Sequence, residues 1–158
     1  MDINLDYQAI SADVRRSLSI IGKRSVDENG NLLFKDITLS SLEEPLLEDY
    51  LHQAAIDITV ETGALITEAT QAGVKLIFPE NVNTAPLMLT ERACKAYCVS
   101  YTLASWFAVT APRLVAKYTK DCTRQMAAIQ QKRPPATPMD GQEEVSPLAP
   151  RTTVTTNP

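Results

Sequence analysis

The first clear pattern in the chain is helical. Apolar residues between Leu5 and Ile21 recur at steps of three and four, which places them on one face of a helix. The residues on that face are Tyr7, Ile10, Val14, Leu18 and Ile21. We expect this face to pack against the core.

A second helix is predicted to begin between residues 42 and 46. Ser40 and Ser41 each precede a glutamate by three residues, and Pro45 follows, which is typical of a helix start. Alternation of apolar residues over 56–60 also leaves a strand open there. The expected core face of the helix is Leu47, Leu51, Ala54, Ile58 and Leu65.

Two segments have the character of strands. Asn29-Gly30 is a pair that tolerates positive φ in a tight turn, so residues 25–34 are expected to form a hairpin or a hairpin-like loop. Val74–Phe78 is a short apolar run ended by a proline, which indicates a strand followed by a loop. That strand is expected to pair with residues 32–34.

The last helical stretch runs from Thr90, a candidate cap, to Lys132. Pro112 interrupts it, because a proline removes one backbone hydrogen bond and clashes with the preceding turn. The stretch therefore divides into a third and a fourth helix. The chain is predicted to be mainly α, a four-helix bundle with a short β element. Side chains expected to be buried are Leu51, Leu103, Trp106 and Tyr118, with Cys94 and Cys98 as free thiols.

The composition changes at Arg133. Residues 134–158 hold six of the ten prolines and few large apolar residues, so they cannot bury enough surface to offset the entropy of ordering. We expect a bundle domain over 1–133 and an extended tail over 134–158. In an assembly, Val145, Leu148 and Val154 of the tail would fill pockets on a neighbouring subunit.

Composition argues against several classes of function. The 158 residues include one histidine and five glycines, which disfavours zinc sites, histidine-based triads and glycine-rich phosphate loops. We therefore expect no enzyme activity, no cofactor and no metal. Three irregularly spaced cysteines and a polar start predict synthesis in a reducing cytoplasm. The seventeen uncharged residues between Lys95 and Arg113 contain too many polar groups for a membrane span, so a central helix is expected there.

Charge is segregated along the chain, whose net charge is −4. Residues 36–61 hold seven acidic side chains and no basic one, whereas residues 113–133 hold six basic side chains and a single acid. Four of the basic residues follow steps of four, three and four and form a stripe on one helix face. This basic stripe consists of Arg113, Lys117, Lys120 and Arg124. A solvated helix exterior, contact with acids of a neighbouring copy, and contact with a nucleic-acid backbone are the alternatives.

The layout resembles the head-to-tail connector, or adaptor, proteins of tailed bacteriophages over about residues 5–135. The resemblance rests on helix order and on these segments: Leu51-His52-Gln53-Ala54-Ala55-Ile56, Val74-Lys75-Leu76-Ile77-Phe78-Pro79, Tyr97 to Trp106, Lys117-Tyr118 and Lys132-Arg133-Pro134-Pro135. It implies a structural protein of the virion neck that forms a homo-oligomeric ring, a dodecamer, beneath the portal protein. The ring would extend the DNA channel without sequence-specific binding and dock tail or neck proteins, away from any membrane.

The charge pattern then predicts which surfaces meet. A head-to-tail ring needs two different, complementary surfaces on each subunit. The candidate interface residues are Glu43, Glu48, Asp49, Arg113, Lys117, Lys120 and Arg124. The alternative function is a small helical regulatory or nucleic-acid-binding protein that places the basic stripe on phosphates.

Overall fold

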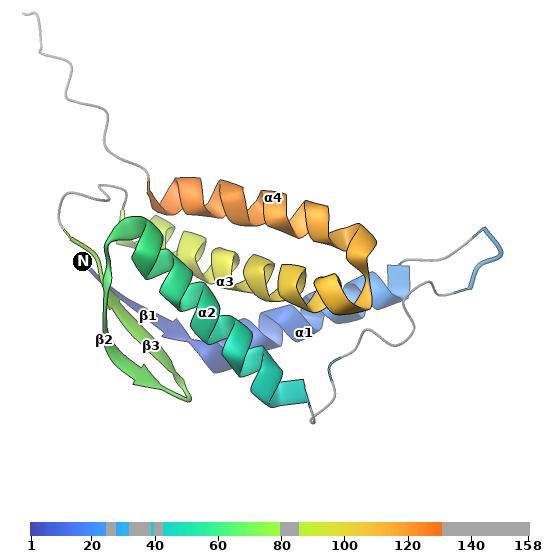
Figure 1. Ribbon diagram of the computed structural model, residues 1–158, viewed down its shortest axis with the longest axis horizontal. Coiled ribbons are helices and arrows are strands. Elements are labelled where there is room, and N and C mark those ends of the chain that lie inside the picture. Colours follow the sequence, from blue (N-terminus) through green and yellow to red (C-terminus); the bar gives the residue numbers. More distant parts are fainter. Residues whose placement is uncertain (25–27, 32–38, 40–42, 80–85, 131–158) are drawn as a thin grey trace, which may run out of the picture.

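The computed structural model describes residues 1–24, 28–31, 39, 43–79 and 86–130 (Figure 1). It confirms a mainly helical fold, in which four helices accompany a three-stranded antiparallel sheet. The elements in chain order are β1 (Asp2–Asp6), α1 (Tyr7–Arg24), α2 (Glu44–Thr62), β2 (Leu65–Thr70), β3 (Gly73–Ile77), α3 (Leu87–Thr110) and α4 (Pro112–Ile129). The predicted tail over 134–158 lies outside the described residues.

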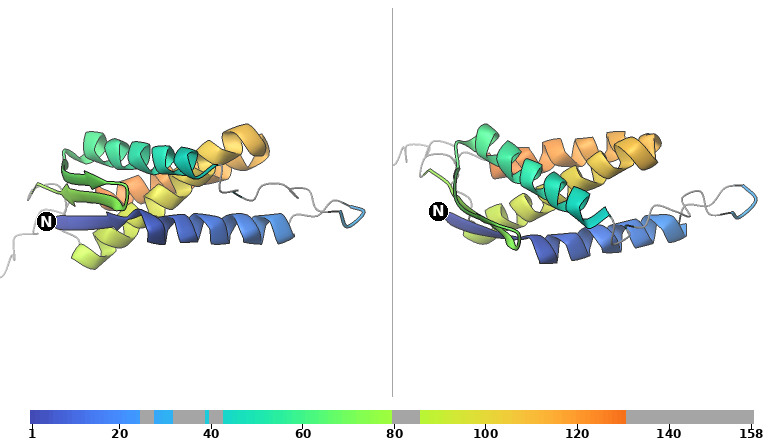
Figure 2. Two further views of the ribbon diagram at one scale, coloured as in Figure 1. Left: turned by 90° about the horizontal axis from the view of Figure 1, so that it is seen from below. Right: turned by 60° about the horizontal axis from the view of Figure 1, so that its bottom comes forward.

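The first predicted helix is α1, although it begins at Tyr7 rather than Leu5. Its start is set by Asp6, whose Oδ1 accepts hydrogen bonds from the backbone N–H groups of Gln8 at 2.9 Å and Ala9 at 3.2 Å. Before that cap the chain forms β1, an unpredicted strand that leads directly into α1 (Figure 2). The predicted face is buried at Tyr7, Ile10, Val14 and Leu18 and partly buried at Ile21.

The sheet has the order β1-β3-β2, with β3 antiparallel to both neighbours. The predicted strand over Val74–Phe78 is therefore confirmed as β3, which begins and ends one residue earlier than predicted. The predicted pairing with residues 32–34, which lie outside the described residues, is wrong, because β1 and β2 occupy both edges of β3. Of the predicted hairpin only residues 28–31 are described, and Gly30 has a φ of 80°, as a tight turn requires.

The second predicted helix is α2, which begins at Glu44 with Pro45 in its first turn. Ser40 and Ser41, its predicted caps, lie outside the described residues. The helix runs through residues 56–60, so the strand alternative there is wrong. Four of the five predicted core residues are buried: Leu47, Leu51, Ala54 and Ile58.

Leu65, the fifth predicted core residue of that helix, is a correction. It belongs to β2 and is 66% exposed. The helix ends earlier because Gly63 takes a left-handed conformation, φ 71°, and its N–H bonds to the carbonyl of Thr59 at 2.8 Å. The prediction extended the helical spacing to Leu65, whereas the helix ends before that residue.

The predicted break at Pro112 separates α3 from α4. Ala111 leaves the helical conformation at φ −151°, ψ 71°, and Pro112 then opens α4, where its missing N–H removes no helical bond. The predicted cap at Thr90 is wrong. Thr90 is buried within α3, which begins three residues earlier at Leu87 after Pro86.

Helix α3 lies at the centre of the molecule and contacts α1, α2, α4 and β1 (Figures 1 and 2). Its buried side chains point in several directions, and Cys94, Cys98 and Phe107 are inaccessible to solvent. The predicted burial is confirmed for Leu51, Leu103, Trp106 and Tyr118, and the predicted buried free thiols for Cys94 and Cys98.

Two glycines test the local account of the sheet and the helix end. A Cβ on Gly73 would lie 2.0 Å from the carbonyl oxygen of Leu5 in β1, so Gly73→Ala must push β1 away from β3. We expect it to lower the free energy of unfolding by about 1–3 kcal/mol or more. The matched control is Gly63→Ala, which meets no atom within 4 Å and costs only the left-handed conformation, about 1 kcal/mol. Denaturant titration in which Gly73→Ala costs less than Gly63→Ala would contradict this account.

Candidate functional site

The basic stripe lies on the outer surface of α4. Arg113, Lys117, Lys120 and Arg124 are all exposed. Arg124 is partly neutralised by Asp121, whose Oδ1 lies 3.0 Å from the guanidinium. The Lys117 ammonium lies 5.0 Å from the centroid of the Tyr118 ring. Among described residues, the other three cations form no ion pair, so their charge is available to a partner.

The candidate acids lie at the start of α2. Glu48 and Asp49 are exposed and Glu43 is half-buried. Glu44, next to them, forms an ion pair with Arg15 of α1. No ion pair within the described residues joins α2 to α4. The structure therefore places the two candidate charged surfaces apart, and a single chain does not bring them together.

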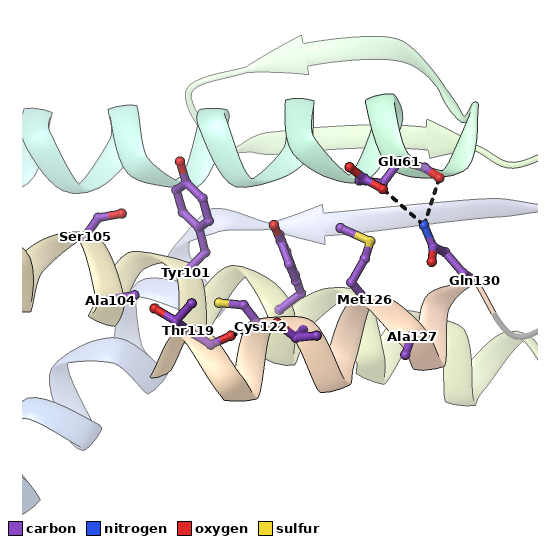
Figure 3. Close-up of a pocket in the computed structure, with 11 residues that line it drawn as sticks. Glu61, Tyr101, Ala104, Ser105, Thr119, Cys122, Met126, Ala127 and Gln130 are labelled. Atoms are coloured by element: carbon purple, nitrogen blue, oxygen red, sulfur yellow. Dashed lines mark hydrogen bonds between the residues drawn. The ribbon is translucent and has the colours of Figure 1, made fainter. Parts of the chain in front are cut away.

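A groove lies between α2 and α4, with α3 as its floor (Figure 3). Its volume is about 560 Å³. It is lined by Glu61 of α2, by Tyr97, Tyr101, Ala104 and Ser105 of α3, and by Thr119, Cys122, Thr123, Met126, Ala127 and Gln130 at α4 and its end.

Two tyrosines one helical turn apart form the floor of the groove. The ring centroids of Tyr97 and Tyr101 are 6.0 Å apart and the planes are tilted by 31°. Burial, and then the Asp57 carboxylate, raise the pKa of both phenols. Both hydroxyls therefore stay protonated at neutral pH. Tyr101 is half-buried and can donate a hydrogen bond to a bound group, whereas Tyr97 is only 7% exposed.

One end of the groove is closed by a link between α2 and α4. The Gln130 side-chain amide donates to the Glu61 carbonyl at 3.0 Å and to its carboxylate at 3.3 Å (Figure 3). One turn earlier on α2, Asp57 is half-buried and accepts a hydrogen bond from Gln53 at 3.0 Å. Carboxylates thus mark the α2 wall, while the α4 wall is neutral.

The three thiols differ in access. Cys122 lines the groove and is half-buried, and burial, followed by the Asp121 charge, raises its pKa to about 11. Burial, and then Glu91, raise the pKa of Cys94 to about 12, and burial raises that of Cys98 as well. These are environments of structural thiols, since reactive cysteines have lowered pKa values.

His52 has a packing role. Its Nδ1 lies 3.1 Å from the Glu48 carbonyl oxygen, and its ring meets the edge of Tyr7 with centroids 5.0 Å apart. In the part of the chain that the structure describes, no three His, Cys, Asp or Glu side chains are grouped to hold a metal ion. The described groove-lining residues offer aromatic, apolar and hydrogen-bonding surface.

Comparison of the chain with protein-family models, with curated proteins and with solved structures found no match in any of the three. The described helices include none with both the length and the apolar character that a membrane crossing requires.

The groove was not predicted from the sequence, although part of its signal is present. Tyr97 and Tyr101 are four residues apart on α3, and Cys122 and Met126 are four apart on α4. Each pair indicates one helix face. Whether the two faces meet at a groove depends on how the helices pack against one another. The spacing of residues along one helix gives no information on that packing.

The groove geometry predicts the order of thiol reactivity in the native full chain. Cys122 should be the one thiol that a maleimide modifies, slowly, because at pKa 11 about one thiol in a thousand is ionised at pH 8. Since the pKa is raised, the rate should keep rising about tenfold per pH unit up to pH 10. Cys122→Ser should abolish the native reaction. A plateau near pH 9, or modification of all three thiols without unfolding, would contradict this description.

Proposed function

We propose that this protein is a structural, non-enzymatic subunit of a bacteriophage neck, a head-to-tail adaptor made in the host cytoplasm. Its copies form a ring beneath the portal protein, extend the DNA channel and provide the platform on which tail or neck proteins dock. The resemblance described above suggests twelve copies. DNA passes through the lumen without sequence-specific contacts.

The observation that carries this proposal is the separation of two oppositely charged surfaces on one subunit. Glu48 and Asp49 at the start of α2, and Lys117 and Lys120 on α4, are exposed and have no ion-pair partner among described residues. Head-to-tail closure needs two such different surfaces. Exposed ion pairs contribute only about 0–1 kcal/mol each, so the charges would set register and partner choice.

Exposed apolar side chains would supply the free energy of association that exposed ion pairs do not. On α2 and β2, Val60 is 76% exposed and Leu65 66% exposed. At the start of α3, Met88 is 80% exposed, with Leu87 and Leu89 beside it also exposed. Burial of such side chains at subunit contacts would supply the free energy that holds a ring together, at about 25 cal/mol per Å² of apolar surface.

One observation favours the alternative, a helical regulatory or nucleic-acid-binding protein. Arg113, Lys117 and Lys120 point outward from one helix without an ion pair to described residues, and such a stripe suits a phosphate backbone. Against it stand the net charge of −4 and the neutralisation of Arg124 by Asp121.

The mass of the purified full chain distinguishes the two functions. Light scattering should give a multiple of the 17.4 kDa subunit, either for the protein alone or after it is mixed with its portal protein. A nucleic-acid binder would instead stay small and shift a DNA fragment, with an affinity that falls steeply as salt is added. A monomer that binds DNA in this way and does not bind the portal protein would refute the proposal.

Charge reversal tests which surfaces meet. Lys117→Glu with Lys120→Glu should weaken ring formation, because each reversal places like charges across the contact. Adding Glu48→Lys and Asp49→Lys should partly restore it. The ring-to-subunit ratio in sedimentation velocity measures both effects. An intact ring with altered DNA retention or ejection would show that the basic stripe faces the lumen instead.

A further inference from the structure

The groove over Tyr97 and Tyr101 has the chemistry of a site for an extended proline-rich segment. Such segments form polyproline II helices that dock in aromatic-lined grooves, where ring faces pack against prolines and side-chain donors reach the free backbone carbonyls. Here Tyr101, which is half-buried, supplies a ring face and a hydroxyl donor, and Tyr97, only 7% exposed, supports it from below. Met126 and Ala127 supply apolar surface on the α4 wall.

The α2 wall of the groove adds a charge requirement. The Glu61 carboxylate lines the groove, and Asp57 lies close enough to raise the pKa values of both tyrosines. The described groove-lining residues include no lysine or arginine. A fitting ligand therefore combines closely spaced prolines with a cationic side chain.

The protein's own C-terminal sequence contains such a segment, Pro147-Leu148-Ala149-Pro150-Arg151. A polyproline II helix has three residues per turn, so Pro147 and Pro150 fall on the same face. Arg151 follows directly and supplies the cation. Five residues at 3.1 Å each span about 15 Å in this conformation. The groove side of α4, from Thr119 to Gln130, is about 17 Å long at 1.5 Å per residue.

We propose that this groove binds the Pro147–Arg151 segment of the same chain, with the two prolines against Tyr101 and the apolar wall formed by Met126 and Ala127, and the Arg151 guanidinium beside the carboxylates of Asp57 and Glu61. This inference does not depend on the proposed ring.

The length of the connection supports docking within one chain. Gln130 itself lines the groove, and sixteen residues separate it from Pro147. Sixteen residues have a root-mean-square reach of about 20–24 Å as an unstructured chain, which is comparable to the groove length, and such a tether gives a millimolar effective concentration. A second proline pair, Pro135 and Pro138, begins only five residues after Gln130, at the end that the Glu61–Gln130 hydrogen bonds close. That pair is a matched control.

Cys122 reports whether the groove is covered. In the full chain, Pro147→Ala with Pro150→Ala should raise the maleimide rate at Cys122 about tenfold, the protection that an affinity near 100 µM gives at millimolar effective concentration. Pro135→Ala with Pro138→Ala should leave the rate unchanged. Circular dichroism confirms that each variant keeps its helices. Equal rates in the unmodified chain and both variants would overturn the proposal.

A cross-link identifies the chain that supplies the segment. In full-length Leu148→Cys, mild oxidation should join residues 148 and 122 within one chain, whereas Thr155→Cys, which lies outside the proposed segment, should react far less. An interchain disulfide at 148 would support the groove and its segment but overturn docking within the chain. Equal yields at 148 and 155 would show tethering alone and overturn the pairing.

Discussion

Burial of α3 on several sides determines where the other elements lie. Cys98 and Phe107 on this helix are wholly inaccessible, and α1, α2, α4 and β1 all contact it. Each of these elements packs its apolar face against α3, so its polar face points outward. The charged surfaces of α2 and α4 are exposed for that reason, and within the described residues no ion pair joins one to the other.

The groove has the same origin. Helices α2 and α4 both pack on α3 and are joined by hydrogen bonds near their C-terminal ends, through Glu61 and Gln130. Between them Tyr101 stays half-exposed, whereas Tyr97 is largely buried beneath the groove. The residues of the site were visible in the sequence as parts of helix faces. Their meeting was not, because it follows from the crossing of helices, and the sequence pattern is silent about crossing angles.

The helices were predictable because their signals are local, whereas the strands depended on partners. The break at Pro112 and the start near Pro45 follow from the geometry of one residue. Strand β1 does alternate, with Ile3 and Leu5 buried, but it is five residues long and runs into α1 without a turn. Strand β2 is exposed on both faces, so it has no alternation of buried and exposed residues from which a strand could be predicted. Thr90 has a side chain of the type that caps helices, but it is buried in the core.

The residues of the charged surfaces were named from the sequence, and all of them except the half-buried Glu43 are exposed. What they contact stays a prediction. Direct imaging of the purified full-length protein by electron microscopy, alone and with the portal protein of the proposed assembly, tests this most directly. The account predicts closed rings with a central channel wide enough for duplex DNA, in which α2 of one subunit faces α4 of the next. Dispersed single subunits under both conditions, or a symmetric two-fold dimer that pairs α4 with α4, would contradict it.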